Sequence, residues 1–211
     1  YGTAGQHGGV VSASRLDTND FSLLGFAAAW SWHNRIELSV ARQELDISAF
    51  ADAVSDLKRE QLRTNTYGVK ARLMGDVLYS RMPQISIGAN YREAINPGLT
   101  ALGGATVPAV LGQGDASNYG SDYYLAATKV FLGGPFGRNW LVNGVVRSTN
   151  ANQGGLVGFG GDLDKSRSVV GEASVGAFIN KHWLVGGEYR QQPENLTLLN
   201  QDDWYDLFVA W

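Results

Sequence analysis

The stretch LLGFAAAWSWHNRIELSVARQELD, residues 23–46, decides the fold. Alternate residues of its first half are apolar, and the dipeptide His33-Asn34 separates this half from a second one, in which Ile36, Leu38 and Val40 alternate with polar residues. A period of two residues is typical of a β-strand with two unlike faces, and a short polar dipeptide between two such runs is typical of a hairpin. The stretch therefore predicts two antiparallel strands joined by a tight turn.

The same alternation continues along the chain. Seven further runs lie near residues 67–73, 85–91, 124–132, 140–146, 169–179, 183–189 and 205–211, and a weaker one precedes them at 10–14. The intervals between runs alternate in length: short at 33–34, 133–139 and 180–182, intermediate at 75–82, and long at 48–63, 95–121, 151–167 and 192–203. Short periplasmic turns and long extracellular loops are typical of bacterial outer-membrane barrels. The sequence predicts an all-β, antiparallel up-and-down transmembrane barrel of about ten strands, in one domain over residues 1–211.

Composition agrees with this and excludes several functions. Glycine makes up 27 of the 211 residues, which disfavours long helices. Cysteine is absent, so disulfides, cysteine-based zinc sites and thiol nucleophiles are excluded. The formal net charge is -3 and no basic patch is visible, which argues against nucleic acid as a partner.

Aromatic residues gather at the ends of the expected strands. Four tryptophans lie beside short turns and two tyrosines at the opposite strand ends: Trp30, Trp32, Trp140, Trp183, Tyr91 and Tyr189. Such belts mark the two membrane interfaces of a transmembrane barrel. The alternative is the aromatic core of a soluble barrel. A soluble barrel would point its charged side chains outward to water. Here the polar, charged face of the strands is the one that turns inward when the sheet closes, so a soluble barrel is disfavoured.

Longer segments carry a family resemblance: RIELSVARQELD (35–46), VKARLMGDVLYSRMPQISIGANYR (69–92), SDYYLAATKVFL (121–132), LVNGVVRSTNANQGGLVGFGGD (141–162), VGGEYRQQPENL (185–196) and DDWYDLFVAW (202–211). Together they resemble the bacterial family catalogued as domain of unknown function 3034, which is described as outer-membrane proteins. The resemblance implies location and fold but no activity. Members of that family continue past the FVAW segment with another hairpin, so it implies twelve strands if this chain is a shortened member and ten if the barrel closes here.

Eleven charged residues occupy the polar positions of the expected strands and would line the lumen: Arg35, Glu37, Lys70, Arg72, Arg92, Lys129, Arg147, Glu172, Glu188, Arg190 and Asp206. Seven are basic and four acidic, and this positive surplus favours anions. Alternatively, the charges pair with one another and fill the lumen, since buried charges need partners. The sequence alone leaves both possibilities open.

The uncharged stretch LTALGGATVPAVLG, residues 99–112, is unusually apolar for a loop. We expect it to fold inward as a constriction formed by Leu99, Leu102, Val107, Val110 and Leu111. The alternative is a surface loop that rests on lipid or on a partner. In the loop before it, Phe50, Val54 and Leu57 have the spacing of a short amphipathic helix, expected to pack as a cap.

The leading hypothesis is an outer-membrane barrel that acts as a narrow, weakly anion-selective diffusion channel for small solutes. A barrel of ten to twelve strands has a narrow lumen. The alternative is a non-conducting structural or partner-binding barrel whose lumen is filled by ion pairs. A hydrophobic-ligand transporter, suggested by the apolar loop, is a third possibility.

No catalytic residue, cofactor or metal site is expected. The histidines, His7, His33 and His182, lie at the periplasmic end or in no assigned element. Asp162 and Asp164 lie two residues apart in a glycine-rich loop, which is more typical of a solvated turn than of a calcium loop.

The expected location is the outer membrane of a Gram-negative bacterium, with long loops extracellular and both termini periplasmic. The expected partners are outer-membrane lipid and lipopolysaccharide. The barrel assembly machinery is a further one during biogenesis, because the final run ends in an aromatic residue, Trp211. The sequence identifies no other protein partner.

Overall fold

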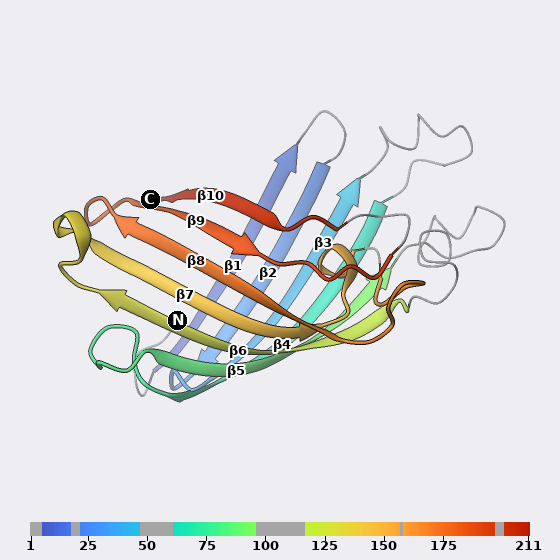
Figure 1. Cartoon of the computed structure of the whole chain (residues 1–211). Coiled ribbons are helices and arrows are strands. Elements are labelled where there is room, and N and C mark those ends of the chain that lie inside the picture. Colours follow the sequence, from blue (N-terminus) through green and yellow to red (C-terminus); the bar gives the residue numbers. More distant parts are fainter. Residues whose placement is uncertain (1–5, 18–21, 47–60, 96–116, 157, 197–200) are drawn as a thin grey trace.

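The computed structural model describes residues 6–17, 22–46, 61–95, 117–156, 158–196 and 201–211. Ten strands form one antiparallel sheet in chain order (Figure 1). They are β1 (His7–Asp17), β2 (Ser22–Trp32), β3 (Ile36–Asp46), β4 (Gln61–Met74), β5 (Gln84–Ile95), β6 (Tyr119–Phe131), β7 (Asn139–Thr149), β8 (Ser168–Phe178), β9 (Leu184–Arg190) and β10 (Trp204–Ala210). The ten predicted strands, including the weak first one, are confirmed.

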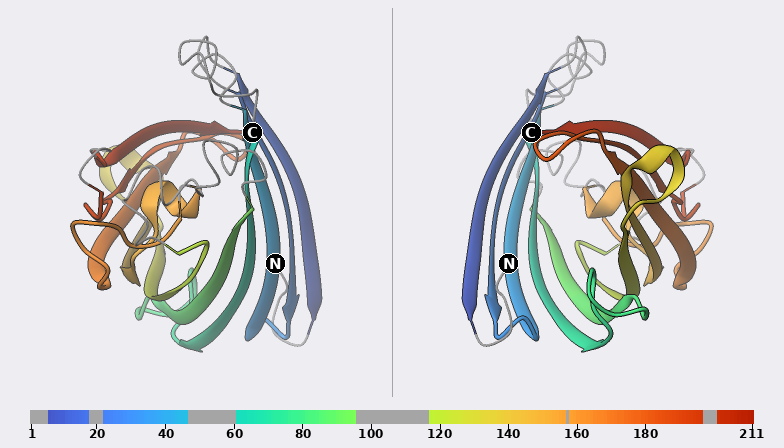
Figure 2. Two further views of the ribbon diagram at one scale, coloured as in Figure 1. Left: turned by 90° about the vertical axis from the view of Figure 1, so that its right-hand side faces the viewer. Right: turned by 90° about the vertical axis from the view of Figure 1, so that its left-hand side faces the viewer.

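The sheet curls into a half-barrel with a concave and a convex face (Figure 2). Within the described residues, β1 pairs with β2 alone and β10 with β9 alone, so the sheet has two free edges. The up-and-down architecture is therefore confirmed, whereas a ring closed by these ten strands is not what the structure has.

The connections follow from local sequence. His33 and Asn34 both have a φ of 51°, and the Arg35 N–H donates to the Trp32 carbonyl at 2.9 Å. Left-handed residues at both central positions give the tight hairpin that matches the right-handed twist of strands. The β1–β2 connection, residues 18–21, is short although it lies at the end where the other connections are long.

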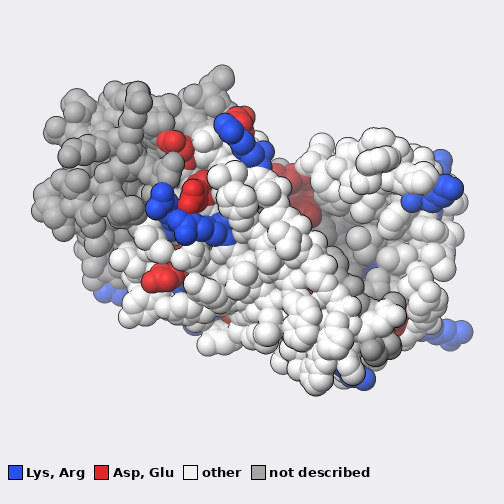
Figure 3. Space-filling view, turned by 180° about the vertical axis from the view of Figure 1, so that it is seen from behind, with Lys and Arg blue, Asp and Glu red and all other residues white. Residues whose placement is uncertain are grey.

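Apolar side chains cover the convex face. Trp30 lies opposite Leu38, and Leu38 opposite Val69, in the register of β2, β3 and β4. Seen from behind, a broad uncharged region lies below the central hollow, and the charged residues gather toward the two ends and in that hollow (Figure 3). No helix in the described part of the chain is long and apolar enough to cross a membrane.

Candidate functional site

The polar positions of the strands meet on the concave face. Residues directly opposite in neighbouring antiparallel strands share one face of a sheet. Glu37 on β3 lies opposite Lys70 on β4, and the Lys70 Nζ is 2.8 Å from Glu37 Oε1. The same row continues through Gly88 and Tyr124 to Arg147. Residues from five neighbouring strands are thus brought into one row.

Gly88 makes room in this row for an aromatic ring. A Cβ at Gly88 would lie 2.3 Å from Tyr124 Cζ, so the ring covers the glycine. The guanidinium carbon of Arg147 lies 5.7 Å from the centre of that ring, within the range of a cation–π contact. Tyr124 therefore contacts both Gly88 and Arg147 on the concave face.

Asp122 on β6 is the most enclosed charge of the site. Its side chain is 0% exposed, and its Oδ2 lies 3.2 Å from Arg92 Nη1 and 3.5 Å from Arg147 Nη1. The Thr149 hydroxyl donates a hydrogen bond to Asp122 Oδ1. A buried carboxylate is stable only with such partners. Asp122 thus holds two arginines from different strands together.

A second carboxylate extends this cluster along the face. Glu172 Oε1 lies 2.8 Å from Arg147 Nε and 3.6 Å from Arg190 Nε. We call Arg92, Asp122, Arg147, Glu172 and Arg190 the arginine network. It combines three guanidinium groups with two carboxylates, so its formal charge is +1.

The β7–β8 connection folds into the concave side beside this network (Figure 2). We call its residues 150–156 and 158–161 the inner segment. The Gly154 carbonyl accepts a hydrogen bond from Arg92 Nη1 at 2.8 Å, and the Gly155 carbonyl accepts one from the Thr64 hydroxyl at 3.3 Å. Gly155 has a φ of +93°, a conformation that favours glycine. The inner segment is therefore fastened to β4 and β5.

Buried side chains fix the inner segment further. Phe159 is 2% exposed and packs on Gly120, where a Cβ would lie 2.3 Å from the ring. The Asn152 Oδ1 accepts hydrogen bonds from Asn195 Nδ2 at 2.8 Å and from Gln201 Nε2 at 3.2 Å. These amides tie the inner segment to the connection between β9 and β10.

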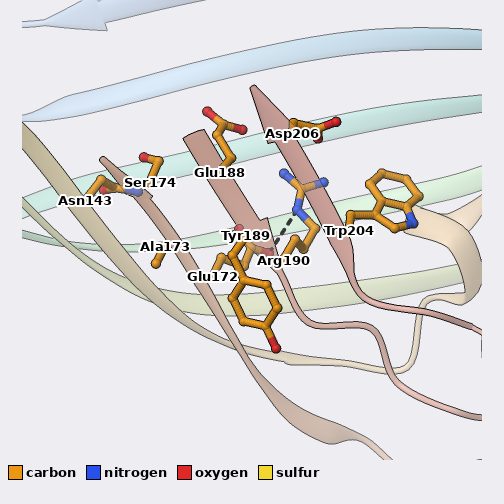
Figure 4. A pocket seen from close by; sticks show the side chains of 9 residues that line it. All are labelled: Asn143, Glu172, Ala173, Ser174, Glu188, Tyr189, Arg190, Trp204 and Asp206. Atoms are coloured by element: carbon orange, nitrogen blue, oxygen red, sulfur yellow. Dashed lines mark ion pairs between the residues drawn. The ribbon is translucent and has the colours of Figure 1, made fainter. Parts of the chain in front are cut away.

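The walls of β7 to β10 enclose a hollow of about 240 Å³ on the concave face (Figure 4). Glu188 and Asp206 lie opposite each other in the register of β9 and β10 and are exposed. Figure 4 shows both acids on the side away from the Tyr189 ring, and its dashed line joins Arg190 to Glu172. Basic groups therefore dominate at the inner segment and acidic groups in this hollow.

Comparison with known proteins then gives the family. The profile of the family described as Protein of unknown function (DUF3034) matches residues 1–211, the whole chain. The chain belongs to this family. Searches of curated proteins and of solved structures give no match.

One lining residue of this DUF3034 protein was predicted on the wrong face. Lys129 lies opposite Val142 and alternates with Asp122, Tyr124 and Thr128, so its position belongs to the convex face. Its Nζ donates to the carbonyls of the β4–β5 connection, including that of Leu78 at 3.4 Å. The two parities of β6 were exchanged because both contain aromatic and aliphatic residues.

Because the two faces of β6 were exchanged, the sequence analysis did not select Asp122 as a lining residue. With Asp122 added and Lys129 removed, the lining has six basic and five acidic residues. The expected surplus of three positive charges therefore falls to one. The correct phase of β6 would have placed Asp122 beside Arg92, its neighbour across the strand pair.

The remaining basic positions lie toward the short turns. Arg35 is exposed beside the β2–β3 turn. Arg72 Nη2 donates to the Gly75 carbonyl at 2.7 Å and lies 3.5 Å from Asp76 Oδ2. Asp76 also accepts the N–H groups of Tyr79 and Leu78, and these bonds lower the pKa of its carboxyl. These residues stabilise the β4–β5 connection.

The aromatic positions lie on the convex face at both strand ends. Trp30, Trp32 and Trp183 are exposed near the short turns, and Trp140 Nε1 donates to the Pro135 carbonyl at 3.1 Å. At the other end, the rings of Tyr91 and Tyr67 stack with centroids 6.4 Å apart. The hydroxyl of Tyr189 donates to Asp203 at 2.6 Å, which lowers the pKa of that carboxyl.

Other expected features fall partly outside the described residues. The constriction residues Leu99, Leu102, Val107, Val110 and Leu111 and the expected helix at 48–57 lie outside them. Asp164 accepts the N–H and hydroxyl of Ser166, as in a polar turn. No group of three metal-binding side chains occurs in the part of the chain that the structure describes.

Proposed function

We propose that this protein is an outer-membrane β-barrel that acts as a narrow diffusion channel for small solutes, with weak selectivity for anions. The observation that carries the proposal is the arginine network beside the inner segment. Three guanidinium groups share two carboxylates there, so a passing anion meets a net positive charge beside the segment that folds into the concave side.

The inner segment supports a narrow passage. It is held to Arg92 and Thr64 by its backbone carbonyls and to Asn195 by a buried amide bond. We therefore propose it as a constriction, whereas residues 99–111, for which the sequence analysis predicted this role, lie outside the described residues. Because the charge of the network is only +1, the expected anion preference is weak.

The convex face supports the membrane location. Exposed apolar side chains such as Trp30, Leu38 and Val69 follow one another across β2, β3 and β4. Eight of the ten strands have at least 11 residues, which is the length that crosses a bilayer at a tilt. Flotation of the refolded protein with phosphatidylcholine vesicles tests this part alone.

Selectivity is tested by Arg92→Gln, with Arg42→Gln as its matched control. The glutamine side chain in R92Q keeps an N–H donor for Gly154 but removes one charge, so the network becomes neutral. Arg42 bears the same charge on the convex face, where it pairs with Glu44 at 2.8 Å. In a planar bilayer under a salt gradient, we expect R92Q to lose the anion preference and R42Q to keep it. Equal reversal potentials for the two variants contradict the assignment.

The structure also offers one observation for a non-conducting, partner-binding barrel. Asp122 is completely enclosed by Arg92, Arg147 and Thr149, as in a lumen filled by its own ion pairs. Discrete conductance steps from inserted protein support the channel. A silent bilayer containing inserted, folded protein supports this alternative.

A further inference from the structure

A shallow apolar groove crosses the convex face from β4 to β8. It has a volume of about 530 Å³. Two adjacent rows of side chains line it in the sheet register. The row nearer the long connections is Val69, Ala89, Tyr123, Ser148 and Val169, the next row is Ala71, Ile87, Leu125 and Val146, and Gly88 and Tyr124 complete the lining.

Small residues explain why the face is recessed there. Ala71 lies beside Ile87, and Ala89 beside Val69 and Tyr123, so each alanine has larger neighbours in its row. Most of the lining is apolar, and the residues with polar side-chain groups are Ser148, Tyr123 and Tyr124. Its surface suits a hydrocarbon chain.

One end of the groove carries a cation. The guanidinium carbon of Arg167 lies 5.0 Å from the centre of the Tyr123 ring, and Arg167 Nε donates to the Ser148 hydroxyl at 3.0 Å. A second N–H of Arg167 donates to the Ser148 carbonyl. A guanidinium has five N–H groups, more than these contacts use. Arg167 is thus oriented by two residues of the groove and keeps donors for an anion.

We propose that this groove and Arg167 form a site for lipid A, with an acyl chain in the groove and a phosphate on Arg167. Arginine binds phosphate through two parallel N–H groups, and the apolar rows below it cover a chain that water would otherwise surround. The charge at one end and the apolar groove beneath it match the two parts of such a lipid.

Lipid A is chosen over a phospholipid because of where Arg167 lies. It precedes β8 at the end of the sheet with the long connections, which is extracellular in the proposed orientation. This inference rests on the membrane location given under Proposed function. The flotation experiment keeps the two apart, because protein that floats with vesicles yet fails to bind lipid A contradicts only the lipid site.

The test uses the 211-residue protein refolded in detergent and titrated with bisphosphorylated lipid A, with bound lipid counted by native mass spectrometry. We expect one lipid A per chain and about tenfold weaker binding for Arg167→Gln, since a charge-assisted hydrogen bond is lost. Arg138→Gln is the matched control, because Arg138 also donates to a backbone carbonyl, that of Ile179, but at the opposite end of the sheet. Equal affinities of R167Q and R138Q overturn the proposal.

A second pair of variants tests the groove itself. Ala89→Trp fills it and is expected to abolish binding, whereas Ala177→Trp, on the convex face opposite Trp140, leaves binding intact. Lipid A without phosphates is expected to bind the wild type and R167Q equally weakly. Tighter binding of phosphatidylglycerol than of lipid A overturns the choice of lipid. Heat-modifiable migration on a gel confirms that each variant is folded.

Discussion

The two halves of the concave face differ in charge. Within β1 and β2, the described positions that face inward are uncharged and mostly small, such as Ser12 and Ala27. From β4 to β9, the same face carries the arginine network and the Lys70 ion pair. The inner segment explains the difference. It packs on β4, β5 and β6, where polar groups are buried and must be paired, whereas most inward-facing positions of β1 are exposed.

The largest expected effect of a single substitution is at Asp122. Asp122→Ala leaves Arg92 without its ion-pair partner in the charged half and is expected to destabilise the fold by about 3–5 kcal/mol, as removal of one partner of a buried pair does. Urea unfolding of the refolded protein, followed by tryptophan fluorescence, measures the loss. Asp206→Ala is the control, because that acid is exposed on the same face. Equal losses for the two variants contradict the view that burial makes Asp122 special.

Ala27→Trp tests the uncharged part of the concave face, which β1 and β2 form. Ala27 lies in the same row as Ala41, Thr66 and Arg92, so a large side chain there narrows the passage at the level of the arginine network. We expect single-channel conductance to fall several-fold. Ala28→Trp is the control, because the next residue points to the convex face. Unchanged conductance in A27W means that solutes do not pass along this half.

The pH dependence of stability tests the role of Asp76 in the β4–β5 connection, which lies outside the arginine network. The N–H groups of Tyr79 and Leu78 lower the pKa of Asp76, so this carboxylate stabilises the folded state above its ordinary pKa, and the contribution is lost as the pH falls through the lowered value. Asp76→Asn is therefore expected to unfold at lower urea concentration than the wild type at neutral pH. In acid below the lowered pKa, the two proteins are expected to converge. A difference that persists in acid contradicts this cause.

Much of the fold was predictable because alternation is a local property. Residues 23–46 contain both faces and the turn of a hairpin, and the register of β2 with β3 follows them directly. β6 shows the limit of this reasoning. Tyr123 and Leu125 on one parity and Tyr124 and Ala126 on the other are all compatible with lipid. Contacts with other strands decide between them: Tyr124 covers Gly88, and Asp122 pairs with Arg92 and Arg147.

The position of the inner segment was not predictable from local pattern. Its fastening depends on Thr64 and Arg92, which are distant in sequence, and on Phe159 finding the bare backbone of Gly120. The apolar stretch at 99–111 was the stronger local signal for a constriction. Glycines with positive φ, such as Gly154 and Gly155, were the available signal for the inner segment, but they indicate a turn and not its direction.

The smallest expected effect lies on β1, the first edge strand of the sheet. Arg15 and Asp17 pair at 2.8 Å on β1, and their side chains are 71% and 55% exposed. Exposed pairs of this kind contribute little to stability, because water screens both charges in the folded state. Arg15→Gln should therefore leave the urea midpoint almost unchanged, in contrast to Asp122→Ala. A large loss in R15Q means that β1 is covered by further structure in the folded protein, since an ion pair matters this much only when it is removed from water.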